Sequence, residues 1–386
     1  MKLAVVIPRY APGALGGAEA HGAAYARKLQ SAGHEVELLT TCARSHATWD
    51  NELPEGESIE DALKIRRFAV RRGNADRFGS TEWRIAHRMH TTHDEQVEWI
   101  KYKGYAPELC DYLCDSDHDR VILMPYSCAT TYFGTLAVPD KAVVHTLLHD
   151  EPYARLAVTE EIVRSASAIL FNSPPETALA RRLFGELPFH GLGGMGFEPF
   201  SSSPDPAGFR TRYGLGAGPI VLYAGRWEGG KGVPRLVDYM RTAAGRRHDW
   251  HLALIGSGPD APQSRKGNIA PVGFIDDSEK HSAFAAADIF CQPSQNESLS
   301  IVLMEAWLAG TPALVNGECA VTRYHCRRSG GGLWFTSYPE FEAAIEALLA
   351  DPRRADAMAA GGRRYVLDVY SWDAVIGRVT EVLEAA

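Results

Sequence analysis

The chain has 386 residues, of which 45% are hydrophobic and 23% are charged. This length predicts about two domains, and this composition excludes a disordered or a collagen-like protein. The net charge is −8, from 40 Lys and Arg against 48 Asp and Glu, which argues against nucleic acid as a partner. No run reaches the roughly 20 apolar residues that a membrane helix requires.

Short runs rich in Val, Ile and Leu alternate with helical stretches, which predicts an α/β protein with parallel strands covered on both faces. In the first half we expect strands at 3–7, 36–40, 121–124, 142–146 and 168–171. Helices are expected between them, at about 17–32, 82–103, 130–136, 157–166 and 174–184. In the second half we expect strands at 220–224, 251–255, 289–292, 313–315 and 333–335. Their helices are expected near 231–245, 278–287, 300–309, 339–350 and 352–369.

The stretch 191–219 is dense in Gly, Pro and Ser, a composition that predicts a linker between two Rossmann-like domains. We expect a first domain over 1–195, a second over 196–370, and a C-terminal helix over 371–386 that crosses back to the first. In such folds ligands bind at the carboxyl ends of the strands. Two domains facing each other across a cleft would therefore both offer loops to one ligand.

The seven cysteines are odd in number and scattered, with no CxxC pair. This usage is typical of reduced thiols and predicts a cytoplasmic protein without a disulfide or zinc framework. The apolar start covers only residues 3–7, which is too short for a signal peptide and instead predicts a buried first strand.

A glycine pair, Gly16 and Gly17, follows the first strand and precedes an Ala-rich helix. Such glycines let backbone N–H groups approach a ligand, and the helix N-terminus behind them favours an anion. NAD binding would need GxGxxG here and an acidic residue after the second strand, and the sequence has neither. A plain tight turn is the alternative for these glycines.

Residues 225–232 match the pattern GxxxxGK, but Gly232 stands where a P-loop needs Ser or Thr to hold magnesium. The segment is therefore a glycine loop, beginning at Gly225, that carries the cations Arg226 and Lys231. Two cations at the mouth of a strand can hold a diphosphate without metal and stabilise its developing charge. A solvated basic loop is the alternative.

The segment 293–307 contains two glutamates eight residues apart, Glu297 and Glu305. Ser300 between them is a predicted N-cap, so the first N–H groups of the following helix would face a phosphate. A phosphate would repel carboxylates, which instead suit hydroxyl groups on either side of it. We therefore expect Glu297 to hold a hexose and Glu305 to hold a ribose.

Taken together, these motifs resemble the retaining family-4 glycosyltransferases of the GT-B fold. The matching pieces follow the family order over nearly the whole chain: 16–19, 33–36, 149–151, 225–232, 256–259, 273–274 and 297–305. The resemblance implies transfer of a sugar from a nucleotide-diphosphate donor to a hydroxyl acceptor, with the anomeric configuration kept. The acceptor would be a small molecule, a lipid-linked sugar or a glycan, and neither a metal nor a cofactor is implied.

The resemblance also implies roles for individual residues. His149 would lie beside the anomeric carbon, although a purely structural histidine is the alternative. Gly17 would close over the diphosphate from the opposite domain, and the loop 273–277 would meet the base through its backbone. The residues implied in catalysis are His149, Glu297, Arg226 and Lys231. The residues implied in donor binding are Gly16, Gly17, Gly225, Phe274, Ile275, Ser298, Leu299, Ser300, Ile301 and Glu305.

One departure concerns the segment after the first glutamate, where the family often has Gly-Phe-Gly and this chain has Ser298, Leu299 and Ser300. The identity of the donor sugar can therefore not be transferred from the family. Because no dedicated nucleophile is evident, we expect a front-face mechanism in which the leaving phosphate takes the acceptor's proton. A nucleotide-sugar epimerase or hydrolase and a non-catalytic nucleotide-sugar-binding subunit are the alternative functions.

The segment 64–104 contains ten Lys and Arg against five acids, on a chain that is acidic overall. A solvated helix face is the favoured interpretation of this segment. Contact with an anionic acceptor, or a weak peripheral contact with an acidic membrane surface, is the alternative.

Overall fold

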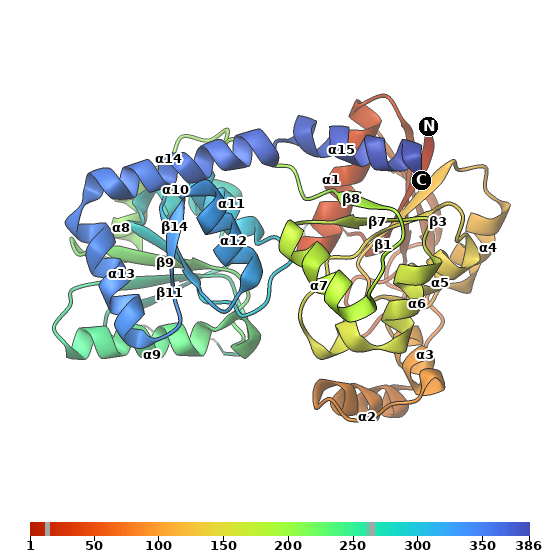
Figure 1. Ribbon diagram of the computed structural model, residues 1–386, viewed down its shortest axis with the longest axis horizontal. Helices are drawn as coiled ribbons and strands as arrows, with labels where there is room; N and C mark the ends of the chain where they lie inside the picture. Colours follow the sequence, from red (N-terminus) through yellow and green to blue (C-terminus); the bar gives the residue numbers. More distant parts are fainter. Residues whose placement is uncertain (12–15, 261, 263–266) are drawn as a thin grey trace. The chain divides into compact units, whose positions relative to one another are not determined.

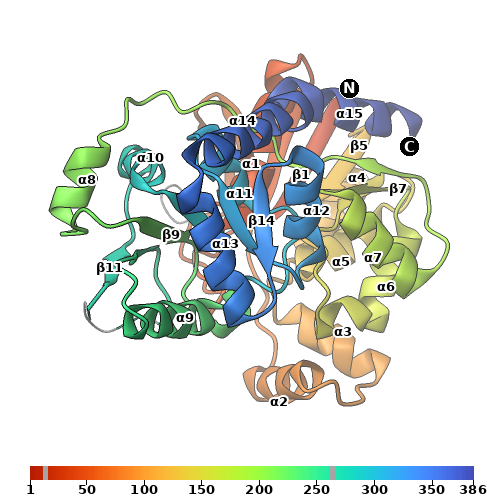
Figure 2. The same cartoon turned by 60° about the vertical axis from the view of Figure 1, so that its left-hand side comes forward.

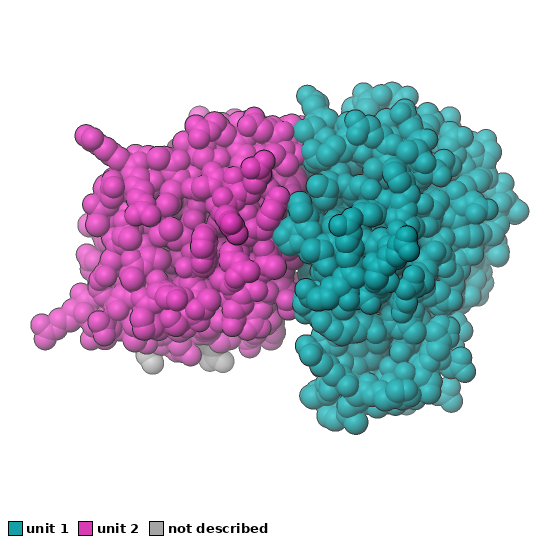
Figure 3. Space-filling view, viewed as in Figure 1, with its two compact units in different colours: residues 1–195, 372–386 teal, residues 196–371 magenta. Residues whose placement is uncertain are grey.

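The structure is a computed structural model that describes residues 1–11, 16–260, 262 and 267–386. It divides into two compact units, which Figure 3 shows in different colours. Unit 1 comprises residues 1–195 and 372–386, and unit 2 comprises residues 196–371. Each unit is an α/β body built on its own sheet (Figure 1), so the expected α/β fold with two parallel-sheet domains is confirmed.

The sheet of unit 1 has the strand order β3-β4-β2-β1-β5-β6-β7-β8. All its pairs are parallel except β3 with β4. The central strands read as continuous apolar runs because helices cover both of their faces, as in residues 3–7, which are fully buried. The strands are β1 (Lys2–Arg9), β2 (Glu35–Thr41), β3 (Gly56–Glu60), β4 (Leu63–Phe68), β5 (Arg120–Leu123), β6 (Ala142–His145), β7 (Ala168–Phe171) and β8 (His190–Leu192).

The helices of unit 1 include the last helix of the chain, which packs on α1, β7 and β8. None of the helices in the described ranges is both long enough and apolar enough to cross a bilayer. The helices are α1 (Gly17–Ser31), α2 (Ala75–Ala86), α3 (His93–Lys101), α4 (Pro107–Asp115), α5 (Ala129–Ala137), the 3₁₀ turn η1 (Pro152–Arg155), α6 (Ala157–Ser165), α7 (Pro174–Phe184) and α15 (Trp372–Ala385).

The sheet of unit 2 is parallel throughout, in the order β11-β10-β9-β12-β13-β14. Figure 2 shows α12 and α13 beside the edge strand β14, on which both helices pack. The strands are β9 (Ile220–Ala224), β10 (His251–Ile255), β11 (Ile269–Gly273), β12 (Ile289–Gln292), β13 (Ala313–Asn316) and β14 (Gly332–Phe335). The helices are α8 (Pro206–Arg212), the 3₁₀ turn η2 (Gly229–Lys231), α9 (Val233–Gly245), α10 (Asp277–Ala286), α11 (Ile301–Leu308), α12 (Ala320–Ser329), α13 (Tyr338–Ala350) and α14 (Pro352–Val369).

Several predicted elements differ from the structure. The single helix expected over 82–103 is wrong, because α2 and α3 are separated by residues 87–92. Thr92 ends this gap as the N-cap of α3, in a capping box with Glu95. Within the expected linker 191–219, Asp205 caps the short helix α8, so this stretch is not wholly irregular.

Candidate functional site

The loop after β9 is shaped by close backbone contacts with the loop after β10. Gly256 has a φ of 120°, and a Cβ atom there would stand 1.9 Å from the carbonyl oxygen of Gly225. Trp227 is buried, its backbone N–H donates to Ser257, and its indole donates to the carbonyl oxygen of Ile255. Glycine is therefore required where these two loops cross, and the contact fixes the chain on both sides of Arg226.

The two predicted cations of this loop lie in different surroundings. The Arg226 side chain is 70% exposed and pairs with Glu228 at 3.1 Å. The Lys231 side chain is only 20% exposed, and its Nζ lies 2.9 Å from Oε1 of Glu297. Gly232 has a φ of 74°, and a Cβ there would meet the carbonyl oxygen of Pro293 at 2.5 Å. This approach between the loops after β9 and β12 brings the Lys231–Glu297 pair together.

Glu297 is held by a second donor that the sequence did not indicate. Gln292, the last residue of β12, is buried, and its Nε2 donates to Oε1 of Glu297 at 2.8 Å. The Glu297 side chain is only 10% exposed. A buried carboxylate needs such partners to stay charged, so Lys231 and Gln292 together stabilise its ionised form and fix its direction.

The N-terminus of α11 follows on the same loop. Ser300 occupies the predicted N-cap position, but its side chain makes no capping hydrogen bond and its φ is 74°. This left-handed conformation favours glycine, which explains the glycine that the family often has here. Ser298 and Leu299 are buried beside it. The N–H groups of Ile301 and Val302 come before the first hydrogen bonds of α11, which run from Leu303 and Met304 to Ser300, and they can bind an anion.

Glu305 lies farther along α11 and is held from α10. Its Oε1 accepts from Nζ of Lys280 at 2.8 Å, and Lys280 also pairs with Asp277 at 2.9 Å. Burial disfavours the charge on Lys280, but Glu305 and Asp277 raise its pKa above the ordinary value of a lysine. Oε2 of Glu305 is buried and has no hydrogen-bond partner among the described residues. Glu305 therefore keeps one oxygen that can accept a hydrogen bond from a hydroxyl group.

The loop between β11 and α10 contains the two residues predicted to lie near a base. Phe274 is 87% exposed, whereas Ile275 is partly buried. The carboxyl ends of β9, β10, β11 and β12 lie on one edge of the sheet because these strands are parallel. The predicted residues of unit 2 all follow these four strands, and Lys231 and Glu297 are in direct contact.

Gly16, Gly17 and His149 belong to unit 1, where they follow the carboxyl ends of β1 and β6. Gly16 is the N-cap of α1 and Gly17 is its first residue. Residues 12–15 of the same glycine loop lie outside the described part of the chain. Nearby, Arg9 at the end of β1 pairs with Glu19 in the first turn of α1.

His149 lies on the loop that follows β6, and its side chain is 30% exposed. Its Nδ1 is 4.0 Å from Oε1 of Glu151, which accepts a hydrogen bond from the Tyr126 hydroxyl. Asp150 pairs with Arg155 of η1 and with Arg182 of α7. The backbone on the far side of His149 is therefore anchored, and the imidazole is partly open to solvent.

The basic segment 64–104 spans β4, α2 and α3 rather than a single helix. Lys64 and Arg66 lie on β4, where both pair with Glu37 and Glu57. Trp83 on α2 is 55% exposed. In the described part of the chain, no group of three or more His, Cys, Asp or Glu side chains is arranged to hold a metal ion.

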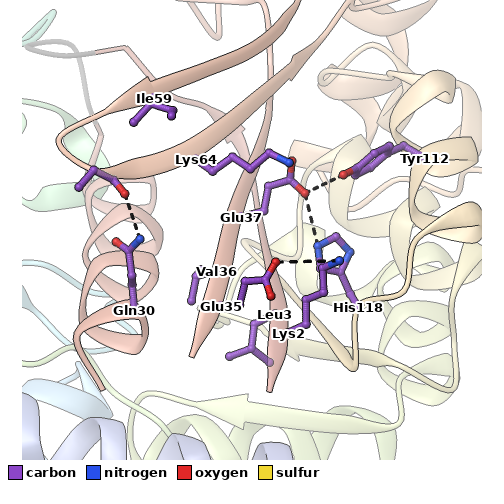
Figure 4. A pocket seen from close by; sticks show the side chains of 11 residues that line it. Lys2, Leu3, Gln30, Glu35, Val36, Glu37, Ile59, Lys64, Tyr112 and His118 are labelled. Carbon is purple, nitrogen blue, oxygen red and sulfur yellow. Dashed lines mark hydrogen bonds and ion pairs between the residues drawn. The ribbon is translucent and has the colours of Figure 1, made fainter. Parts of the chain in front are cut away.

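A cavity of about 250 Å³ opens at the amino ends of β1, β2 and β4, and Figure 4 shows its lining. Its central carboxylate, Glu37, accepts from the Tyr112 hydroxyl at 2.7 Å and lies 3.3 Å from Nζ of Lys64. Burial opposes this charge, but bonds with His118, Tyr112 and Lys64 lower the pKa of Glu37 to about 2. Parallel sheets bind ligands at the opposite edge, at the carboxyl ends of their strands.

The chain is similar to known proteins in sequence and in structure. Residues 213–365 match the family described as glycosyl transferases group 1. The chain is 26% identical to a phosphatidyl-myo-inositol mannosyltransferase of Mycobacterium tuberculosis, over 100% of this chain and 97% of that protein. It is 32% identical to a GDP-mannose-dependent alpha-(1-6)-phosphatidylinositol monomannoside mannosyltransferase of Mycolicibacterium smegmatis, over 49% of this chain. That second match spans about half of the relative's length, 54%.

Among solved structures, the chain is similar to sucrose-phosphate synthase from Thermosynechococcus elongatus, with a TM-score of 0.74 and 20% identity over 100% and 99% of the two chains. At this identity the likeness shows the fold alone, which is the GT-B fold. The family resemblance of the sequence motifs is thereby confirmed. Residues 213–365 therefore match the group 1 glycosyl transferases, and the chain as a whole has the GT-B fold.

Proposed function

We propose that this protein is a retaining glycosyltransferase that moves a sugar from a nucleoside-diphosphate sugar to a hydroxyl group without needing a metal ion. The observation that carries the proposal is the contact between Lys231 and Glu297 in front of the N-terminus of α11. A cation and free N–H groups suit a diphosphate, whereas a carboxylate in the same place suits hydroxyl groups. A sugar joined to a diphosphate satisfies both requirements.

In this proposal Lys231, Arg226 and the first N–H groups of α11 hold the diphosphate. These groups stabilise the leaving diphosphate more strongly as its negative charge develops, so they lower the barrier rather than merely bind the donor. Glu297 accepts hydrogen bonds from the hydroxyl groups of the donor sugar. Glu305 accepts from the ribose, a role supported by its unpartnered Oε2.

The transfer is proposed to occur on one face of the sugar. The bond between the anomeric carbon and the phosphate oxygen breaks as the bond to the acceptor oxygen forms, and the acceptor's proton passes to the departing phosphate oxygen. The position of Glu297 supports this route, because Lys231 and Gln292 both donate to its Oε1 and make it a weak nucleophile. His149 is proposed to lie beside the anomeric carbon, and trapping a covalent glycosyl adduct would refute the front-face step.

The names of the relatives support GDP-mannose as the first donor to test and a lipid-linked polyol or sugar as the acceptor class. A thermal-shift screen against GDP-mannose and the glucose conjugates of UDP, ADP and TDP tests the donor directly. A ligand at about 100 times its Kd adds about 2.7 kcal/mol, which raises the Tm of a domain of this size by roughly 5–10 °C. We expect such a shift with the sugar conjugate of one nucleotide, and we expect the same shift in the presence of EDTA. No shift with any of the four contradicts the proposal.

Removing Lys280 should weaken nucleotide binding although this residue need not touch the nucleotide. In Lys280→Met the Glu305 carboxyl loses its cation, becomes harder to ionise and accepts hydrogen bonds from the ribose less well. We expect the Kd for GDP, measured by calorimetry, to rise about 10-fold. The preference for GDP over 2′-deoxy-GDP should also shrink.

Lys280→Arg is the matched control, because it keeps a cation beside Glu305 and should preserve most of the affinity. An unchanged Kd for GDP in Lys280→Met would show that Glu305 does not depend on its lysine.

A further inference from the structure

The loop that carries His149 follows an unusual backbone. Leu147, two residues before His149, has a φ of 55°. A leucine adopts this left-handed conformation only when the surrounding structure imposes it, and such positions cluster at functional sites. The contacts that impose it come from one side chain of the neighbouring helix α7.

That side chain is Glu176, which is fully buried in the first turn of α7. Its Oε1 accepts from the Thr146 hydroxyl at 2.7 Å and from the backbone N–H of Leu148. Its Oε2 accepts from the backbone N–H of Asn172 at 2.6 Å. One carboxylate therefore hydrogen-bonds to the chain on both sides of Leu147 and connects it to the end of the next strand, β7.

Burial makes the negative charge on Glu176 unfavourable. No Lys or Arg pairs with Glu176 in the described part of the chain, so N–H and O–H donors and the N-terminus of α7 support its charge alone. Burial raises the pKa of Glu176 to about 7, against the effect of its bonds with Leu148, Thr146 and Asn172. An apolar residue at this position would leave the N–H groups of Leu148 and Asn172 without this acceptor, so the carboxylate is needed to hold the loop.

The other side of the loop is fixed by the same helix. Arg182, six residues along α7 from Glu176, pairs with Asp150. The backbone around His149 is thus held by α7 before and after it, while the imidazole itself is 30% exposed. Such an arrangement fixes the backbone that carries the imidazole, while the partly exposed ring stays accessible to a substrate.

We propose that Glu176 is a positioning residue for His149, which acts by locking the backbone of residues 146–148. This inference rests on the proposed function, in which His149 lies beside the anomeric carbon. A catalytic group displaced by about 1 Å loses up to about 100-fold in rate. Glu176 therefore acts on the chemistry without touching the substrate.

The decisive variant is Glu176→Gln, which keeps the shape of the side chain but must turn an amide N–H₂ toward one of the N–H groups that Glu176 accepts from. Glu37→Gln is the matched control, because Glu37 is also a buried carboxylate of unit 1 and lies at the opposite edge of the sheet, in the cavity of Figure 4. Thr146→Val removes one of the three bonds and is the milder variant if Glu176→Gln fails to fold.

Two measurements separate positioning from general stability. The first is amide hydrogen exchange over residues 146–151, which should quicken about 10-fold in Glu176→Gln and stay unchanged in Glu37→Gln. The second is the release of nucleoside diphosphate from the four nucleotide sugars of the thermal-shift screen. We expect kcat to fall about 10- to 100-fold in Glu176→Gln, but less than about 2-fold when the same change is made in His149→Ala.

Equal exchange in the Glu176→Gln and Glu37→Gln variants, or an equal loss of kcat with and without His149, would overturn the inference. If the unaltered protein turns over none of the four nucleotide sugars, the proposed function fails instead. The exchange measurement then still decides whether Glu176 locks the loop.

Discussion

Lys231→Ala is expected to lower kcat/KM by about 10²–10³-fold, the loss typical of removing a charge that stabilises a leaving oxyanion. Lys231 is the better buried of the two cations on the loop after β9, so its charge is less screened than that of Arg226. The variant also removes a donor to Glu297. The measurement is the steady-state rate of nucleoside diphosphate release.

Arg241→Ala is a suitable control for Lys231→Ala, because Arg241 forms an exposed pair with Asp238 on α9 of the same unit. Such pairs contribute little, so its kcat/KM should stay within about 2-fold of the original. Full activity in Lys231→Ala would remove Lys231 from the donor site and, with it, the basis of the proposed function.

Glu297→Gln and Glu305→Gln should have opposite binding signatures, because Glu297 is assigned to the donor sugar and Glu305 to the ribose. Glu297→Gln should reduce turnover about 100-fold or more, yet leave the Kd for the free nucleoside diphosphate within about 3-fold. Glu305→Gln should weaken free and sugar-linked nucleotide alike, by about 10-fold. Calorimetry with GDP and GDP-mannose distinguishes the two patterns.

Each of these two variants serves as the isosteric control for the other, since both replace a carboxylate in the same unit by its amide. Exchange of the two signatures would mean that the sugar and the ribose bind the other way round. Loss of GDP binding in both variants would show that the carboxylates support the loop rather than read separate parts of the donor.

The buried strands of both sheets could be predicted because parallel strands covered on two faces read as short apolar runs. β3 and β4 were missed because the edge of the sheet is partly exposed and alternates, as in Leu63–Phe68, where Lys64 and Arg66 interrupt the apolar residues. β11 was missed because Pro271 stands within it. The gap between α2 and α3 left a readable signal, the Thr92 and Glu95 pair three residues apart.

The placement of the motif residues directly after strands could be predicted, because short apolar runs precede them. Their roles in binding and catalysis stay predictions. The contributions of Gln292, Lys280 and Glu176 could not be predicted, because each of them contacts another side chain or a neighbouring loop. Their elements carry no spacing that marks such a partner. The position of Ser300 as N-cap was predicted, but its left-handed backbone was not, since a serine gives no local sign of it.

The return of the chain from unit 2 to unit 1 has a consequence for biosynthesis. Unit 2 is one continuous stretch, 196–371, whereas unit 1 needs α15, which covers α1, β7 and β8. Domains usually fold as they leave the ribosome, the earliest-made first. Here the order is reversed at its last step, because unit 1, most of which is made first, cannot complete its fold until residues 372–386 have been translated. Until then its apolar surface over α1, β7 and β8 stays uncovered.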